Sequence, residues 1–256
     1  MKDRKNICES VKEYAASLRL SSIQKSFEHA ARRAESESLS YEHYLCELLR
    51  EEYEQRWNRR VQRYLRESRL NLEKNMDTFE MKRLPPKVSR RVDILLEGDF
   101  LRRQENILAF GNPGSGKTHL LSAIAQELIH RGHRIYFTTC SMLVQKLLQA
   151  KRDLELERIL KKLRRFEAVF IDDFGYIQQS REEMDVLFTL LAEWYERRSI
   201  MITSNLPFSK WQDIFKDPMT TAAAIDRLVH HSVVLELNLS SYRAEEAREQ
   251  QKSKSA

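Results

Sequence analysis

The sequence predicts an α/β fold, in which a mostly parallel sheet with flanking helices follows an all-helical N-terminal domain. Residues 1–83 contain no glycine and no proline, and their apolar residues recur at helical spacing. From about residue 100, short apolar runs alternate with helical stretches, which is typical of βαβ units. We therefore expect a helical domain over 1–83, a linker over 84–99, an α/β domain over 100–243 and a flexible tail over 244–256.

A long helix is predicted in the N-terminal domain. Ser40 is suited to the N-cap and Glu42 to the first turn. The apolar residues that follow at steps of three and four are Leu45, Leu48, Leu49, Tyr53, Trp57, Val61 and Tyr64. Pro85 and Pro86 interrupt this pattern, because neither can donate a backbone hydrogen bond. A domain edge is expected there.

Five strands are predicted in the second domain. They are expected near Ile107–Phe110, Arg134–Thr138, Ala168–Ile171, Ser199–Thr203 and Val233–Leu237. The helix after the first strand is expected to end at Gly132, which suits a left-handed cap. Residues 141–165 and 181–198 are expected to form further helices.

Composition narrows the class of protein. The chain has 256 residues, 41% hydrophobic and 32% charged, and no apolar run approaches the roughly 20 residues that span a bilayer. We therefore expect a cytoplasmic protein with no membrane contact. Its three cysteines lie far apart, which argues against a zinc site or a disulfide framework. A net charge of +6 is compatible with a nucleic-acid partner, and equally with a solvated basic face.

A phosphate-binding loop stands between the first strand and its helix. The segment is Gly111, Asn112, Pro113, Gly114, Ser115, Gly116, Lys117 and Thr118. Glycines let backbone N–H groups wrap phosphates, Lys117 reaches the β- and γ-phosphates, and the Thr118 hydroxyl ligates Mg²⁺. Three of the chain's six glycines lie in this loop, which argues against coincidence. The sequence therefore predicts a site for ATP with Mg²⁺.

Two carboxylates follow the third predicted strand. Asp172 is expected at the carboxyl edge of the sheet in the Mg²⁺ shell, and Asp173 beside an attacking water. In isolation the segment could be a buried strand before an acidic turn, but the upstream loop favours the Walker B interpretation. Related ATPases more often have glutamate at the second position. Asp173 is one methylene shorter, so we expect slow hydrolysis.

A polar residue follows the fourth predicted strand. Asn205 is placed to hydrogen-bond the γ-phosphate or the water. An asparagine in a turn before Pro207 explains the same residue equally well.

Taken together, residues 40–243 resemble the IstB-type transposition helper ATPases, which belong to the AAA+ class alongside the DnaC-like helicase loaders. The matching blocks are Gly111-to-Leu120, Asp172-Asp173-Phe174-Gly175-Tyr176, Thr203-Ser204-Asn205-Leu206-Pro207-Phe208 with Trp211, Ala224-Ile225-Asp226-Arg227-Leu228 and Ser241-Tyr242-Arg243. The first block adds His119 to the nucleotide-binding residues. The resemblance thus predicts an AAA+ P-loop fold.

The resemblance also implies roles for two arginines. Arg227 corresponds to the arginine finger that reaches a neighbouring subunit's γ-phosphate, and Arg243 to the sensor-2 arginine. Without the resemblance, surface ion pairs would be the preferred interpretation of both. Leu239 stands where the family usually has glycine, so the turn before Arg243 can differ from that of the family.

The function that the resemblance implies is regulation of DNA transposition. Members assemble on double-stranded DNA as ATP-dependent homo-oligomers, cooperate with a transposase, and hydrolyse ATP when DNA or transposase stimulates them. A candidate DNA surface is the basic stripe at helical spacing formed by Arg56, Arg59, Arg60, Arg63 and Arg66. A solvated or subunit-pairing face explains the stripe as well.

Three alternatives remain open. A helicase loader would share the ATPase half, although Trp211 and the pair His230-His231 are closer to the IstB-type members. A small-molecule kinase would show an acceptor pocket and an arginine-bearing lid in place of Asn205 and Arg227. A nucleotide-dependent switch with almost no hydrolysis is the third, for which Asp173 is the main argument.

Overall fold

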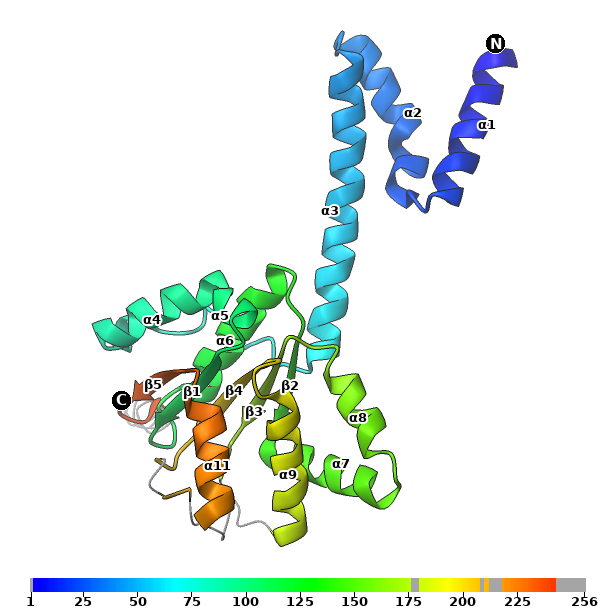
Figure 1. Ribbon diagram of the computed structural model, residues 1–256. Coiled ribbons are helices and arrows are strands. Elements are labelled where there is room, and N and C mark those ends of the chain that lie inside the picture. Colours follow the sequence, from blue (N-terminus) through cyan, green and yellow to red (C-terminus); the bar gives the residue numbers. More distant parts are fainter. Residues whose placement is uncertain (1, 176–179, 208–209, 212–217, 243–256) are drawn as a thin grey trace, which may run out of the picture. The chain divides into compact units, whose positions relative to one another are not determined.

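The computed structural model describes residues 2–175, 180–207, 210–211 and 218–242 (Figure 1). The chain divides into two compact units, Met1–Arg63 and Tyr64–Ala256. The division falls inside a helix, whereas the sequence placed the domain edge after residue 83. Each unit is described separately below.

The N-terminal unit consists of three helical segments. They are α1 (Lys2–Ser17), α2 (Ser21–Ser36) and the first part of α3 (Tyr41–Ser68). The breaks contain Arg19 and Ser38, with φ angles of 58° and 51°. The Ser40 hydroxyl accepts the His43 N–H at 3.3 Å, as expected for an N-cap.

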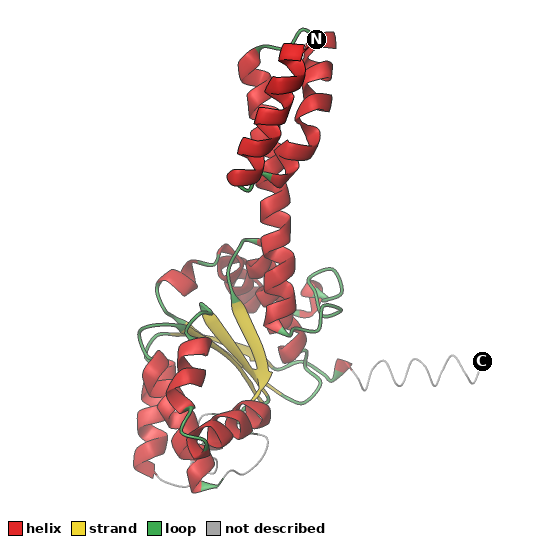
Figure 2. Cartoon of the chain, turned by 90° about the vertical axis from the view of Figure 1, so that its right-hand side faces the viewer, coloured by secondary structure: helices red, strands yellow, loops and turns green. Residues whose placement is uncertain are grey.

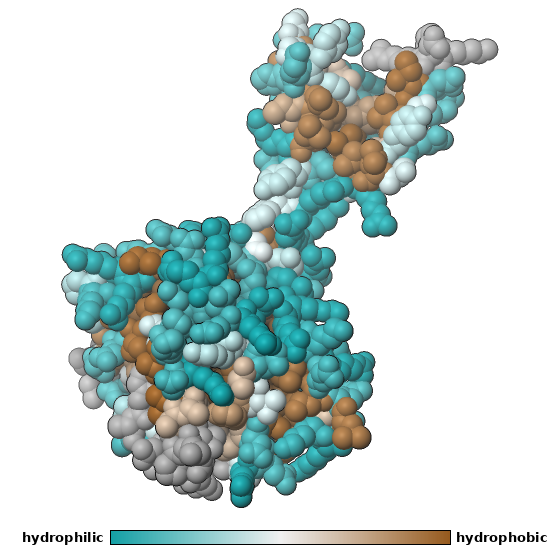
Figure 3. Space-filling view, viewed as in Figure 1, coloured by the Kyte–Doolittle hydropathy of each residue, from teal (hydrophilic) through white to brown (hydrophobic). Residues whose placement is uncertain are grey.

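Apolar side chains reach the surface of the N-terminal unit. Figure 3 shows them as brown atoms on this unit. The exposed large apolar residues of this unit include Ile7, Tyr14, Leu18, Tyr41, Leu45, Leu49 and Tyr53.

The region before the sheet differs from the prediction. Residues 69–80 form turns and not helix, and η1 (Met81–Arg83) is a single 3₁₀ turn. Within the predicted linker 84–99, α4 (Pro86–Glu97) starts at its proline and is followed by the short helix α5 (Asp99–Arg102). Proline is tolerated at the first helical position, because the N–H there has no intrahelical partner.

A five-stranded parallel sheet forms the centre of the second unit. Its strands are β1 (Asn106–Gly111), β2 (Ile135–Thr139), β3 (Ala168–Asp172), β4 (Ser199–Ser204) and β5 (Ser232–Leu237), in the order β2-β3-β4-β1-β5. The prediction of five strands is confirmed, with every boundary within one residue. The register pairs Ile107 with both Met201 and Val233.

Helices cover both faces of this sheet (Figures 1 and 2). They are α6 (Lys117–His130), α7 (Cys140–Arg152), α8 (Leu156–Leu163), α9 (Arg181–Trp194) and α11 (Pro218–Val229). The predicted helix 141–165 is two helices, because Leu154 has a φ of 58° between them. Gly132 follows α6 with a φ of 94°, as predicted.

The strand order gathers the carboxyl ends of three strands. β4 lies between β3 and β1, so Asp172, Ser204 and Gly111 end neighbouring strands at one edge. Ligands bind at this edge in open α/β sheets. Among the described helices, none combines the length and the apolar character that a membrane span requires.

Candidate nucleotide-binding site

The loop between β1 and α6 depends on its glycines. Gly111 has a φ of 154°, and a Cβ atom there would overlap the carbonyl oxygen of Leu237. Gly116, with a φ of 90°, is the N-cap of α6. Gly114 and Gly116 have no side chains of their own and φ angles of 78° and 90°, and a glycine loop before a helix lets backbone N–H groups approach a phosphate.

Lys117 crosses this loop from the first turn of α6. Its Nζ donates to the carbonyl oxygens of Gly111 at 2.8 Å and Asn112 at 2.9 Å. The side chain is buried, at 8% exposure. A phosphate oxygen would offer the ammonium group a charged acceptor, which makes a stronger hydrogen bond than a carbonyl. Lys117 therefore lies where the sequence predicted a phosphate contact.

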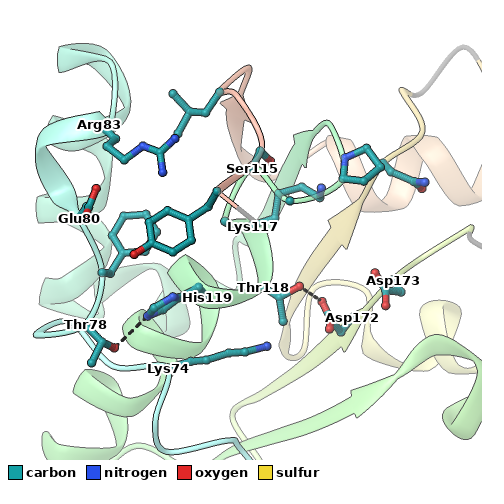
Figure 4. A pocket seen from close by; sticks show the side chains of 17 residues that line it. Lys74, Thr78, Glu80, Arg83, Ser115, Lys117, Thr118, His119, Asp172 and Asp173 are labelled. Atoms are coloured by element: carbon teal, nitrogen blue, oxygen red, sulfur yellow. Dashed lines mark hydrogen bonds between the residues drawn. The ribbon is translucent and has the colours of Figure 1, made fainter. Parts of the chain in front are cut away.

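Thr118 and Asp172 meet across the edge of the sheet. The Thr118 hydroxyl donates to Asp172 Oδ1 at 2.7 Å (Figure 4). Asp172 is buried at the end of β3. A hydroxyl oxygen and a carboxylate are the hard oxygen ligands that Mg²⁺ prefers, so these residues fit the predicted metal.

Asp173 lies beside this pair and is exposed. It lines a cavity that is also lined by Lys117, Thr118 and Asp172. Its φ is 56°, in the left-handed region. Its backbone N–H donates to Thr203 Oγ1 at 3.0 Å. Aspartate is among the residues that enter this region at low cost, so the local backbone accounts for aspartate at this position.

Asn205 follows β4 directly and is exposed at the cavity. Since β4 lies between β3 and β1, Asn205 is placed between the ends of the Asp172 strand and the Gly111 strand. The structure thus brings together Lys117, Thr118 and Asn205 with the two aspartates.

The opposite wall of the cavity was missed by the sequence analysis. The cavity has a volume of about 580 Å³. The lining residues from before α4 and after β5 are Lys74, Thr78, Phe79, Glu80, Arg83, Leu239 and Tyr242. The Phe79 ring packs edge-on against His119, with centroids 5.3 Å apart. The Arg83 guanidinium lies 5.1 Å from the centre of the Tyr242 ring. These rings offer an apolar surface of the kind that a nucleotide base requires.

His119 joins this wall to the phosphate loop. Its Nε2 lies 3.0 Å from Thr78 Oγ1 and 3.2 Å from the carbonyl oxygen of Asn75. Burial lowers the pKa of His119, the Asn75 carbonyl opposes this shift, and the Lys74 ammonium adds to it. A lowered pKa favours the neutral form of the His119 imidazole near pH 7.

Arg227 lies in α11 and is not among the described residues that line the cavity. Its guanidinium carbon is 4.6 Å from the centre of the Phe188 ring. Its Nη1 is buried and has no hydrogen-bond partner in the part of the chain that the structure describes. The structure therefore does not bring Arg227 to the phosphate loop of its own chain.

Arg243 lies outside the described residues. Its neighbour Tyr242 donates its backbone N–H to the carbonyl oxygen of Gly114 at 3.0 Å. The chain just before Arg243 therefore contacts the phosphate loop.

The predicted basic stripe on α3 is exposed at all five arginines. Contacts within the N-terminal unit include those of Arg56, Arg59 and Arg60. Arg56 binds Glu52 at 2.7 Å and the carbonyl oxygen of Arg19, and Arg59 binds the Ser21 hydroxyl at 2.9 Å. Arg60 lies over the Trp57 ring at 5.7 Å. Arg56 and Arg59 thus hold the start of α2, which the sequence pattern did not indicate.

The fold is similar to that of solved replication ATPases. The structure of AMPPCP-bound DnaA from Aquifex aeolicus has a TM-score of 0.56 at 18% identity, and the match covers 72% of this chain and 56% of that one. The DnaC helicase loader has a TM-score of 0.55 at 16% identity, covering 64% of this chain and 97% of that one. These likenesses confirm an AAA+ P-loop fold.

Sequence relatives match over more of the chain. A putative insertion sequence ATP-binding protein of Sinorhizobium fredii is 41% identical over 233 residues, 91% of this chain and 78% of the relative. The insertion sequence IS5376 putative ATP-binding protein of Geobacillus stearothermophilus is 35% identical over 243 residues, 95% of this chain and 97% of the relative. The IS21 putative ATP-binding protein of Pseudomonas aeruginosa is 36% identical over 217 residues, 84% of this chain and 82% of the relative.

The family described as IstB-like ATP binding protein matches residues 13–252, which include most of the N-terminal helices and the whole cavity lining. The glycine loop and the Thr118–Asp172 pair are what a protein of an ATP-binding family requires, in agreement with this match. The chain belongs to the IstB-like family of ATP-binding proteins.

Proposed function

We propose that this chain is an ATP-dependent regulator of DNA transposition, which assembles on double-stranded DNA and acts with a partner transposase. The observation that supports it best is the extent of the matches. The IstB-like family matches residues 13–252, and the three insertion-sequence relatives named above align over 84% to 95% of the chain. The N-terminal helices thus resemble those of the insertion-sequence proteins, and this part of the chain would recognise the partner.

The site supports slow hydrolysis of ATP. Lys117 binds the β- and γ-phosphate oxygens, while Thr118 and Asp172 hold Mg²⁺, which neutralises phosphate charge when bound. Asp173 orients the attacking water and accepts its proton, and Asn205 donates to the γ-phosphate or positions the water.

Arg227 acts in trans in this proposal. Among the described residues, its guanidinium does not line the cavity, and its buried Nη1 has no hydrogen-bond partner. A γ-phosphate of a neighbouring subunit would supply an anionic acceptor. Hydrolysis then requires a homo-oligomer, and Arg243 would complete the site from the segment after β5.

Sedimentation velocity tests the proposal. The full chain is compared with Lys117→Ala in the presence of ADP or a non-hydrolysable ATP analogue, each with and without duplex DNA. For the wild type with DNA, we expect large DNA-bound species in the presence of the ATP analogue and not in the presence of ADP. Lys117→Ala should remain small, because it loses a charged phosphate contact. A wild-type species whose size is indifferent to nucleotide and DNA contradicts the proposal.

The helicase-loader function is the second candidate, because the fold is also that of the DnaC helicase loader. The two functions differ in the protein that stimulates hydrolysis. A transposase encoded beside this chain should raise the ATPase rate, whereas a replicative helicase should leave it unchanged. The reverse result would favour the loader.

A further inference from the structure

Thr203 lies in β4 just past the point where the pairing with β3 stops, while its pairing with Ala109 of β1 continues. The last β3–β4 pair is Ile171 with Ile202. The next residues on the two strands, Asp172 and Thr203, are joined by their side chains instead. Thr203 has no exposed surface. We infer that Thr203 is a positioning residue for ATP hydrolysis, whose hydroxyl holds both Asp172 and Asp173 in their working orientation.

The hydrogen bonds of this hydroxyl have a fixed direction. Thr203 Oγ1 accepts the backbone N–H of Asp173 at 3.0 Å and donates its proton to Asp172 Oδ1. A hydroxyl has one proton to donate, and an ionised carboxylate can only accept. The Thr118 hydroxyl donates to the same Oδ1 at 2.7 Å. Thr118 and Thr203 therefore fix the rotation of the Asp172 carboxylate from two sides.

Further bonds attach the acidic turn to the end of β4. The Phe174 N–H donates to the carbonyl oxygen of Thr203 at 2.8 Å. The Ser204 hydroxyl donates to the carbonyl oxygen of Phe174 at 2.8 Å. Asn205 is the first residue after β4. One short segment, residues 203–205, therefore holds the carboxylates of Asp172 and Asp173 and carries the Asn205 amide. We expect a change at Thr203 to shift all three groups.

The Thr203 hydroxyl also holds the backbone of Asp173. Asp173 has a φ of 56°, and its N–H bond to Thr203 holds that unusual conformation. Without this acceptor the turn can relax toward the right-handed region, which would rotate the Asp173 side chain away from its present position. The inferred role is indirect, because Thr203 is not among the residues that line the cavity.

The inference rests on the proposed ATPase site, and its test uses no DNA or transposase. The variants are Thr203→Val, which keeps the shape and removes the hydroxyl, and Thr203→Ser, which keeps the hydroxyl. Thr138→Val is the matched control, because Thr138 is a buried threonine of β2 whose hydroxyl bonds the Thr139 carbonyl.

The readouts separate binding from chemistry. For Thr203→Val we expect kcat to fall about 10- to 100-fold, the range typical when a partner of a metal-ligating group is removed. We also expect a higher Mg²⁺ concentration at half-maximal activity and at the midpoint of a Mg²⁺ titration of nucleotide binding. The affinity for a fluorescent ATP analogue without Mg²⁺ should stay unchanged. Thr203→Ser and Thr138→Val should stay close to the wild type.

Two results would overturn the inference. One is a Thr203→Val chain with wild-type kcat and Mg²⁺ dependence. The other is an equal loss of kcat and melting temperature in Thr203→Val and Thr138→Val, which would mean that a buried hydroxyl matters for folding alone. The Mg²⁺ titration of nucleotide binding needs no turnover, so it decides the matter for a very slow enzyme too. Failure of the DNA-assembly proposal would leave the Mg²⁺ dependence of nucleotide binding intact, so the two failures can be told apart.

Discussion

Asp173 combines a chemical role with a backbone requirement. The proposed mechanism needs a carboxylate beside the γ-phosphate, and the turn after β3 needs a residue that accepts a φ of 56°. Aspartate and asparagine enter the left-handed region more readily than other side chains that carry a Cβ atom. Aspartate is therefore the acidic residue that meets both needs, at the cost of one methylene of reach.

The two requirements can be separated by substitution at Asp173. Asp173→Asn should keep the free energy of unfolding and lower the single-turnover hydrolysis rate by about 10²-fold or more, because it removes a general base. Asp173→Glu should keep a carboxylate but destabilise the fold by roughly 1 kcal/mol, the cost of the left-handed conformation. Thermal unfolding and single-turnover kinetics measure both effects.

A different outcome for Asp173→Glu would be informative. An equally stable chain that hydrolyses ATP faster would show that the turn refits around glutamate. The backbone would then not explain the aspartate.

At the scale of an element, α2 is capped by a side chain from another helix. Leu20 at its N-cap makes no side-chain hydrogen bond. Glu52 of α3 instead accepts the N–H groups of Ser22 at 2.7 Å and Ile23 at 3.2 Å. Arg56 binds the other carboxylate oxygen at 2.7 Å. Because a helix N-terminus favours negative charge, the ionised form of Glu52 stabilises this packing.

The pKa of Glu52 predicts how this packing responds to pH. Burial would raise the pKa, but the bonds from Arg56, Ser22 and Ile23 lower it below the ordinary value of 4.5. A lowered native pKa means stability that is present above about pH 4.5 and is lost as the pH falls through the native value. We expect hydrogen-exchange protection factors of α2 to decrease over that acidic range.

Glu52→Gln should remove this dependence. It should lower the protection of the first turn of α2 at pH 7 by about 1–2 kcal/mol, because a charged acceptor becomes neutral. Glu54→Gln on the same helix is the control, since Glu54 is exposed. Equal protection in the wild type and Glu52→Gln would contradict the capping role.

For the whole molecule, the sequence predicted the sheet better than the helices. Strands such as 168–172 are short, apolar and bounded by polar residues, and parallel topology places their carboxyl ends together. The position of Asp172 beside Thr118 follows from that topology. The helix breaks at Arg19, Ser38 and Leu154 use left-handed residues other than glycine, which a search for glycine and proline does not detect.

The cavity wall was harder to predict, because its residues are far apart in sequence. Residues 69–83 have no glycine or proline, but they do contain turn-forming polar side chains. Asn71 accepts the Glu73 N–H at 3.0 Å, and Asn75 accepts the Thr78 N–H at 3.0 Å. Pro86 and Gly98, at the start and end of α4, were the available signal for that helix. No local pattern could place Phe79 against His119.

Mixing two inactive variants tests the central claim of ATP-dependent assembly with a trans-acting arginine most directly. Arg227→Ala keeps the ATP site and lacks the finger, whereas Asp173→Asn keeps the finger and lacks the proposed base. Each alone should hydrolyse little ATP, and we predict that the mixture recovers hydrolysis, because some interfaces then combine an intact site with an intact finger. A mixture that co-sediments as one oligomer and stays inactive would contradict the account.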